Sequence, residues 1–439
     1  MVAAMCGQRV SSEDNLMKDL LRAAVAAAVV TGSASSQAAV SGAEWEQFKA
    51  QFAEMAARVE ALEAENARLK QQGSSVPVDD LSKLQADVAV LQSQNSAAAW
   101  SEKIKIGGDF RYRYEYIDVE DRDSRERNRI RARMAVTAKL PSDTEVGLGV
   151  ATGGDDPVST NQTLGGGGST KDLRLDKAYF RWNATEEFHL QAGKFSNPLY
   201  KPQKSSLLWD GDWRPEGVSA GWAGNHLFAN FLGNWLESDT RGNNDEFAWG
   251  LQGGTRFNLG EASLTTAVAY YDFPTAGARP FYGDDDEPEF FGNSFTDDDR
   301  YLYNYEMIEI GGDLSMNLFE MPLSIYANFV QNQDADDYDT GWLAGATLGK
   351  AKGKGTWAVG YQYRDLEADA VLGLLSDSDF AGGGTDGKGH VITGAYGINK
   401  QWSLGFTWFV NNEAGEKNLA EEGGALDYDR IQIDTKFKY

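Results

Sequence analysis

The feature that most constrains this chain is an alternation of apolar and polar side chains with a period of two, from residue 103 onward. In residues 104–116, isoleucine, phenylalanine and tyrosine side chains share one face, and charged side chains share the other. Residues 129–140, 402–410 and 431–439 repeat the pattern. A period of two is that of a β-strand, whose successive side chains point to opposite faces. We therefore expect an all-β structure here.

The kind of side chain on each face favours a membrane barrel over a soluble sheet. The polar face carries several full charges per strand, and the apolar face is rich in Trp, Tyr and Phe towards the strand ends. A transmembrane β-barrel has a polar, water-filled interior and aromatic girdles on its outer surface. This pattern predicts a transmembrane antiparallel β-barrel over residues 99–439.

Connections between the expected strands alternate in length. Short links lie at residues 141–143, 183–186, 223–225, 258–261, 319–321, 350–354 and 399–401. Long polar segments lie at residues 119–126, 152–171, 196–216, 238–245, 273–300, 333–340, 365–387 and 411–429. Counting strands between these links gives about sixteen, an even number as in bacterial barrels. Both ends of the barrel then fall on the short-turn, periplasmic side.

The first 38 residues are predicted to be a signal peptide with an N-terminal extension. Lys18 and Arg22 precede an apolar run over residues 23–30, and residues 36–38 (SQA) fit a cleavage site. Met17 is the expected initiator because it directly precedes this basic region. The single cysteine, Cys6, would be removed with the extension, so we expect no disulfide framework and no cysteine-based metal site.

Residues 39–98 show a heptad pattern, from which we predict a short periplasmic α-helical coiled coil. Apolar side chains and one asparagine recur at alternating spacings of three and four, at Trp45, Phe48, Phe52, Met55, Val59, Leu62, Asn66 and Leu69. An asparagine at a core heptad position fixes register and oligomeric state. The alternative is an amphipathic helix packed on its own domain.

Several segments together resemble the Gram-negative Putative porin family, which is related to the general trimeric porins. They are the coiled-coil leader, the aromatic C-terminus, and residues 107–113 (GGDFRYR), 127–133 (RNRIRAR), 177–182 (KAYFRW), 191–200 (QAGKFSNPLY), 208–212 (LWDGD) and 215–218 (PEGV). The terminal Tyr439 departs from the usual Phe. The resemblance implies a homotrimer in the outer membrane, among lipid and lipopolysaccharide, that the barrel-insertion machinery recognises through its last strand. It also implies passive diffusion of small hydrophilic solutes and ions.

A basic cluster on the first two expected strands is the strongest functional signal. Five arginines share the inward face of neighbouring strands about 4.8 Å apart, so they form a wall that favours anions. The predicted pore-lining residues are Arg111, Arg113, Arg129, Arg131, Arg133, Lys105, Asp109 and Glu115. The alternative is a structural ladder that is neutralised by Asp109, Glu115 and acids from loops folded inward.

The third long segment, residues 196–216, is predicted to fold into the pore as a constriction loop. The resemblance implies this role, and mixed charge with aromatic side chains suits it. The predicted constriction residues are Tyr200, Lys201, Lys204, Asp210, Asp212 and Arg214. The alternative is an ordinary surface loop.

No catalytic, metal or cofactor site is expected. The three histidines, His189, His226 and His390, form no metal-binding spacing, and a net charge of −25 argues against a nucleic-acid partner. Acidic clusters at residues 284–289, 297–299 and 334–339 are expected in external loops, either as solvated faces or as divalent-cation sites at the lipopolysaccharide surface.

Two other functions stay open. One is a substrate-specific channel for an oxyanion or small acid. The other is a structural anchor that the coiled coil tethers to peptidoglycan.

Overall fold

The computed structural model describes residues 103–238, 246–284, 287–415 and 424–439, and ten helical residues between 53 and 68. The chain divides into two compact units, Met1–Gln94 and Asn95–Tyr439. The predicted signal peptide and nearly all of the predicted coiled-coil seam lie outside the described residues. Of that seam only Leu62 is described, and it is helical and exposed. No described helix is both long enough and apolar enough to cross a membrane.

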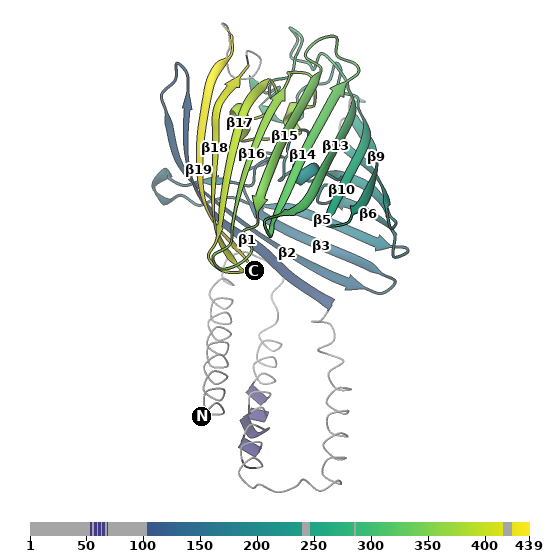
Figure 1. The fold of residues 1–439 in the computed structure, drawn as a ribbon, viewed down its shortest axis with the longest axis vertical. Helices are drawn as coiled ribbons and strands as arrows, with labels where there is room; N and C mark the ends of the chain where they lie inside the picture. The colour runs from purple at the N-terminus through teal and green to yellow at the C-terminus, as the bar shows by residue number, and fades with distance from the viewer. Residues whose placement is uncertain are drawn as a thin grey trace. The chain divides into compact units, whose positions relative to one another are not determined.

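Sixteen long strands form one closed antiparallel sheet in the second unit (Figure 1). They are β1 (Ile104–Val119), β2 (Arg125–Leu140), β3 (Thr144–Thr152), β5 (Leu173–Asn183), β6 (Phe188–Lys194), β7 (Glu216–Ala223), β8 (Leu227–Glu237), β9 (Glu246–Leu259), β10 (Ala262–Phe273), β13 (Tyr305–Leu318), β14 (Met321–Asn332), β15 (Thr340–Gly349), β16 (Trp357–Leu366), β17 (Gly387–Gly397), β18 (Trp402–Ala414) and β19 (Leu426–Lys438). Each pairs with its neighbours in chain order, and β1 pairs with β19. The predicted barrel of about sixteen strands is confirmed.

Short elements occupy the long connections. The short strand β4 (Gln162–Thr163) pairs with β2, and β11 (Gly283–Asp284) pairs with β12 (Glu287–Pro288). Four single 3₁₀ turns are η3 (Gly166–Gly168), η4 (Pro202–Lys204), η5 (Gly373–Leu375) and η6 (Phe380–Gly382). The last three belong to two loops that carry part of the site described below.

Alternation along the strands sorts apolar side chains to the outside of the barrel. In β1, Phe110 and Tyr112 are exposed, whereas Arg113 and Glu115 on the other face are 4% and 0% exposed. The same inversion holds in β19, where Ile433 is exposed and Asp434 is buried. A soluble sheet would bury the apolar face, so this sorting is that of a barrel surrounded by lipid.

The long connections do not all remain outside the barrel. Residues 365–387 and 273–300 were expected only as polar external segments, and this expectation was wrong for much of each. Leu372, Leu374 and Leu375 are buried with Phe290 and Tyr301 in one apolar cluster. The physical reason is local composition, because an apolar run such as residues 370–375 gains free energy by leaving water. Asp297, Asp298, Asp299, Asp334, Asp336 and Asp337 are exposed, as expected of external loops.

The barrel closes at a narrow seam. The Gly108 amide donates to the Tyr439 carbonyl at 3.0 Å, and the Tyr439 amide donates to the Gly108 carbonyl at 3.2 Å. A Cβ atom at Gly108 would lie 2.2 Å from the Arg133 carbonyl oxygen, whereas one at Gly253 in β9 would meet nothing within 4 Å. Closure therefore requires glycine at position 108 and does not require it at position 253.

We predict that Gly108→Ala destabilises the barrel by roughly 1–3 kcal/mol, the usual cost of an overpacked site. Gly253→Ala is the matched control, and it should be neutral or stabilising by up to about 1 kcal/mol, because glycine in a strand interior is unfavourable. Urea unfolding of the protein in lipid vesicles, followed by tryptophan fluorescence, measures both. Equal free energies of unfolding for the two variants would contradict the role given to Gly108.

Candidate functional site in the barrel interior

The site begins with an unusual pairing of like charges on β1 and β2. Arg111 lies directly opposite Arg131, and Arg113 lies directly opposite Arg129. Opposed side chains have Cβ atoms about 5 Å apart, and two unit charges at that distance repel by roughly 3 kcal/mol at an effective dielectric constant of 20. The arginines therefore need carboxylates nearby to remain folded together.

One source of carboxylates is β1 itself, beside the arginines of β1 and β2 that form the arginine wall. Asp109, opposite Arg133 in the register, lies 2.7 Å from Arg133 and 3.0 Å from Arg131. Glu115 is fully buried and pairs with Arg127, and its distance to Arg129 is 3.7 Å. Two wall carboxylates cannot neutralise all the arginines of β1 and β2, so further acids must come from elsewhere.

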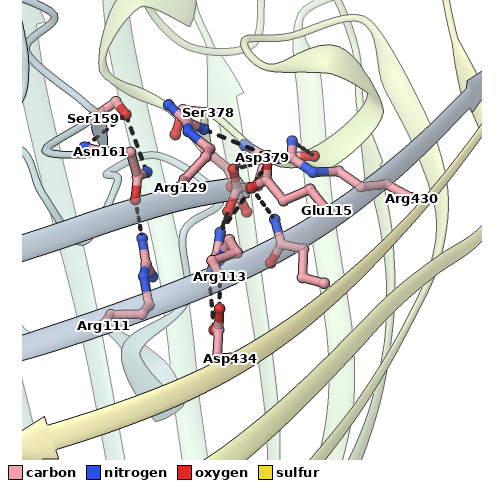
Figure 2. A network of polar contacts seen from close by, with 12 residues as sticks. Arg111, Arg113, Glu115, Arg129, Ser159, Asn161, Ser378, Asp379, Arg430 and Asp434 are labelled. Atoms are coloured by element: carbon pink, nitrogen blue, oxygen red, sulfur yellow. Dashed lines mark hydrogen bonds and ion pairs between the residues drawn. The ribbon is translucent and has the colours of Figure 1, made fainter. Parts of the chain in front are cut away.

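The closing strand supplies another carboxylate and another arginine. Arg113 donates from Nε and Nη2 to the two oxygens of Asp434, at 2.7 and 3.0 Å. Arg430, which is 2% exposed, donates to Glu115 at 2.7 Å. Figure 2 shows these side chains converging from β1 and β19 on one point of the interior. Ion pairs thus cross the seam where the barrel closes.

Two loops add further carboxylates from the opposite side. Asp212, from the loop of residues 196–216, lies 2.8 Å from Arg133 and 3.5 Å from Arg131. Asp379, from the loop of residues 367–386, lies 2.9 Å from Arg113 and 2.7 Å from Arg430 (Figure 2). Residues distant in sequence therefore meet at the arginine wall.

The loop of residues 196–216 is held inside the barrel by polar contacts at its start. The Tyr200 amide donates to the Gln252 side chain at 2.7 Å, and that side chain donates back to the Tyr200 carbonyl at 2.9 Å. The Tyr200 hydroxyl donates to Asp313, and Lys201 donates to the Trp209 carbonyl at 3.0 Å. The alternative of an ordinary surface loop does not describe this segment.

Apolar side chains of the same loop fill one side of the interior. Trp209 and Trp213 stack at a centroid distance of 4.8 Å, and Trp209 meets Tyr271 of β10 edge-on at 5.1 Å. The cluster joins the loops to inward-facing residues of β8–β10 and β13–β16, namely Leu232, Ala248, Ala269, Tyr271, Phe273, Tyr305, Met307, Val330, Leu343 and Leu366. The charged side of the interior, along β1, β2 and β19, is left outside this cluster.

The loop of residues 367–386 packs against residues 290–294 through buried amide and carboxyl groups. The Asn293 side chain donates to the carbonyls of Ala368 and Val371 at 2.6 and 2.8 Å and accepts from the Gly373 amide at 2.8 Å. Asp369 accepts from the Ser294 amide at 2.8 Å. Such satisfied buried polar groups fix the conformation of a loop, because breaking one leaves an unpaired group without water.

The loop aspartates differ in their proton affinity. Burial alone would raise the pKa of Asp212, but Arg131 and Arg133 outweigh it and hold the pKa below its usual range. The pKa of Asp379 is likewise held far below its usual range, because Arg430 and Arg113 outweigh burial. Burial, followed by the nearby charges of Asp377 and Asp212, raises the pKa of Asp210 to about 8. Asp210 is therefore mostly protonated at neutral pH.

Two cavities flank the inward loop. One of 480 Å³ is lined by Asp109, Arg133, Lys177, Lys201 and Lys438, and one of 310 Å³ is lined by Arg111, Arg113, Arg131, Asn161, Arg364 and Gln432. Asp210 and Gly211 line both cavities. The tip of the loop therefore lies between two open spaces on the charged side of the interior.

The predicted site residues do not all meet. Lys105 is exposed at the start of β1 and lines neither of the two cavities. Lys204, the last residue of η4, is exposed and lines the cavity of 310 Å³. Arg214 is buried, pairs with Asp176 of β5 at 3.2 Å, and lines the cavity of 480 Å³ together with Arg133. Sequence reasoning missed Asp379, Arg430, Asp434 and Asn161. The period of β19 could have indicated Arg430 and Asp434, because they share its inward face, but no pattern marks Asp379 or Asn161.

Histidines and acidic clusters take no part in this site. Within the described segments, no group of three or more His, Cys, Asp or Glu side chains is arranged to hold a metal ion. His390 lies within 2.8 Å of the Tyr361 hydroxyl, and the His226 ring lies 3.4 Å from the Arg256 carbonyl. These histidines have ordinary structural partners.

A sixteen-stranded barrel with an apolar outer surface, a charged interior and loops folded inward defines the protein as an outer-membrane β-barrel of the porin class. The family model described as Putative porin matches residues 118–307 and 296–439, which is more than half of the chain. The chain therefore belongs to this family, whose members are channels and not enzymes.

Solved structures agree with the fold. The chain is similar to OprB of Pseudomonas putida, with a TM-score of 0.52 and 12% identity over 80% of this chain and 97% of that one. It is also similar to OmpF of Salmonella typhi (TM-score 0.48, 10% identity, 76% and 97% covered) and to the trimer form of OmpT of Vibrio cholerae (0.45, 11%, 76% and 99%). No curated protein matches the sequence. The likeness to OprB, at 12% identity, shows the fold alone.

The raised pKa of Asp210 yields a prediction for Asp210→Asn. Folded Asp210 binds its proton more tightly than the unfolded chain does, since its pKa rises from 3.8 to about 8, so it costs the wild type stability as pH rises between these values. The variant has no such proton. Its free energy of unfolding relative to wild type should rise from about pH 4 to pH 8 and then level off.

Urea unfolding in detergent micelles at several pH values measures this difference. A hydrogen bond lost with the second carboxyl oxygen would change the free energy of unfolding by the same amount at every pH. The test is therefore how the difference between variant and wild type changes with pH. Asp297→Asn, in an exposed loop, is the matched control and should show no such trend. A difference between Asp210→Asn and wild type that is flat with pH would contradict the buried, protonated carboxyl.

Proposed function

We propose that the chain is an outer-membrane porin through which small hydrophilic solutes and ions diffuse passively. We further propose that the passage is narrowest where the loop of residues 196–216 lies against the arginine wall of β1 and β2. The observation that carries this proposal is the pairing of Asp212 with Arg131 and Arg133, which ties the loop to the wall inside the barrel. The two cavities that meet at Asp210 and Gly211 support a route past this point.

In this proposal the passage runs along the charged side of the interior, because the apolar loop cluster fills the side of β8–β16. The proposed pore-lining residues are Arg111, Arg113, Arg129, Arg131, Arg133, Lys105, Asp109 and Glu115, and the proposed constriction residues are Tyr200, Lys201, Lys204, Asp210, Asp212 and Arg214. Arginines facing loop carboxylates create a field across the passage, which orients polar solutes and excludes apolar ones. No covalent step is involved.

The ion pairs also define how the wall selects ions. Arg113, Arg131 and Arg133 each have carboxylates within 3.0 Å, so much of their attraction for a passing anion is cancelled locally. The alternative of a neutralised ladder is therefore supported for these residues. Weak anion preference is the expected net property, since basic side chains still outnumber acidic ones in the network.

We also propose a homotrimer, with the coiled coil of residues 39–98 in the periplasm. The direction of β1 supports the periplasmic position of the coiled coil. This strand begins at the end of the barrel that carries the short turns, where Ile104 pairs with Ala138. In this proposal the last strand is recognised by the barrel-insertion machinery, and lipid and lipopolysaccharide surround the barrel. Oligomeric state by chemical crosslinking of the full chain, with and without residues 39–98, tests the contribution of the coiled coil.

A structural anchor that the coiled coil tethers to peptidoglycan is the second candidate. The apolar cluster formed by inward-folded loops favours it, because such a cluster narrows the interior and stabilises the barrel. The two candidates differ in conductance. An anchor needs no passage, whereas a porin reconstituted in a planar bilayer conducts in discrete steps, in groups of three if it is trimeric.

Replacing Arg111, Arg129 and Arg131 together by Gln should abolish the anion preference of the pore and shift its selectivity towards cations. The triple variant removes three positive charges from the wall and leaves Asp109, Asp212 and Glu115 in place. The measurement is the reversal potential in a potassium chloride gradient, which should move towards the potassium equilibrium potential by at least about 10 mV, with ~59 mV per decade as the limit for one charge. Lys350→Gln, which removes an exposed charge in the short turn between β15 and β16, is the control. An unchanged reversal potential in a conducting triple variant would refute the role of the wall.

A further inference from the structure

Arg111 differs from Arg113, the other inward-facing arginine of β1, in having no ion-pair partner within the part of the chain that the structure describes. It is 7% exposed, and its one hydrogen-bond acceptor is the Asn161 side-chain oxygen. Among the described residues no carboxylate lies within ion-pair distance of Arg111, and its Nε has no hydrogen-bond partner. A buried guanidinium without a counterion is costly, because desolvation is not repaid by a partner.

The carboxylates near Arg111 are paired with other arginines. Arg113 uses both oxygens of Asp434, and Arg131 shares Asp109 and Asp212 with Arg133. Including Arg111, eight basic side chains meet five carboxylates in this network. The basic ones are Arg111, Arg113, Arg127, Arg129, Arg131, Arg133, Arg430 and Lys436, and the acidic ones are Asp109, Glu115, Asp212, Asp379 and Asp434. The excess of positive charge includes Arg111.

Asn161 holds Arg111 in one orientation. This residue directly precedes β4, which pairs with Arg129 and Ile130 of β2. Its side-chain nitrogen donates to the Ser159 hydroxyl at 3.2 Å, so its oxygen faces Arg111 (Figure 2). One Nη2 proton is therefore occupied, and the buried Nε has no hydrogen-bond partner in the described segments.

Open polar space lies beside Arg111. The cavity of 310 Å³ includes Arg111 and Asn161, neutral polar groups such as Ser205, Thr407 and Gln432, and charged side chains of both signs. The charged side chains are Arg113, Arg131, Lys204 and Arg364 on one hand and Asp210, Asp212, Asp377 and Asp379 on the other. The size of the cavity lies at the lower end for small-molecule sites. Asp212, Asp377 and Asp379 already pair with arginines of the protein, whereas Arg111 pairs with no carboxylate of the described chain. A small anion with oxygen acceptors therefore matches Arg111 and the neutral polar groups beside it.

We propose that Arg111 and Asn161 form an anion-binding subsite that takes a small oxyanion, a carboxylate or a phosphate, on its way through the pore. The planar guanidinium matches two oxygens of such a group better than it matches a spherical chloride. This inference rests on the proposed porin function. It adds to the arginine wall one position that makes no direct ion pair with a carboxylate of the described residues.

The test uses Asn161→Asp, which gives Arg111 a carboxylate of its own with almost no change in volume. Inorganic phosphate and gluconate are added separately to wild-type pores conducting chloride in a planar bilayer. We expect at least one of them to reduce the current in a saturable manner. Asn161→Asp and Arg111→Gln should each raise its half-blocking concentration tenfold or more, which corresponds to about 1.4 kcal/mol.

Lys438→Gln is the matched control, because it removes one positive charge from the neighbouring cavity of 480 Å³. Its half-blocking concentration should stay within about twofold of wild type. An equal loss of block in Lys438→Gln and Asn161→Asp would overturn the subsite, since the effect would then be one of net charge. Absence of block by both anions in conducting wild-type pores would also overturn it.

These outcomes separate the subsite from the proposed function. If the wild-type protein conducts and is not blocked, the proposed subsite is wrong and the proposed porin function stands. If the wild-type protein folds and does not conduct, the proposed porin function itself is wrong. Folding of each variant is checked independently by the heat-dependent shift of the barrel in gel electrophoresis.

Discussion

Neutralisation of the opposed arginines on β1 and β2 is the constraint on which the interior depends. Arg111 opposite Arg131, and Arg113 opposite Arg129, would repel each other in any isolated hairpin. The hairpin is tolerated because carboxylates reach it from β19 and from two loops. Removing one partner of a buried pair is far more costly than the pair is favourable, so these contacts fix the geometry of the loops more than they add stability.

The loops must also bury their apolar residues, which they do on the other side of the interior. Their apolar residues leave water by packing on inward-facing side chains of β8–β16, while their aspartates face the arginines. One segment thus satisfies both sides: Trp209 stacks in the apolar cluster, and Asp212, three residues later, pairs with Arg133. The charged face between the loop and the arginines follows from this division, because the apolar residues cannot pack against arginines and the aspartates cannot be buried in the apolar cluster.

Much of the barrel could be predicted from sequence because its rules are local. A period of two places Phe110 outside and Arg111 inside, and turn composition marks where each strand ends, so strand number and wall follow directly. Loop placement is not local. Asp379 meets Arg113 across 266 residues of sequence, and nothing around it distinguishes it from the exposed Asp297. The apolar residues 370–375 were the available signal that their loop folds inward, and polar neighbours on both sides masked it.

Closure of the barrel and assembly of the wall depend on the same contacts. The pairing of β1 with β19 brings Asp434 to Arg113 and Arg430 to Glu115, so the ion pairs form only when the first and last strands meet. Asp379 then bridges Arg113 and Arg430 across that seam. An open sheet would lose the pairs of Arg113 with Asp434 and of Arg430 with Glu115, which makes incomplete closure unfavourable. The charges that line the proposed passage therefore also select the closed barrel over its open alternatives.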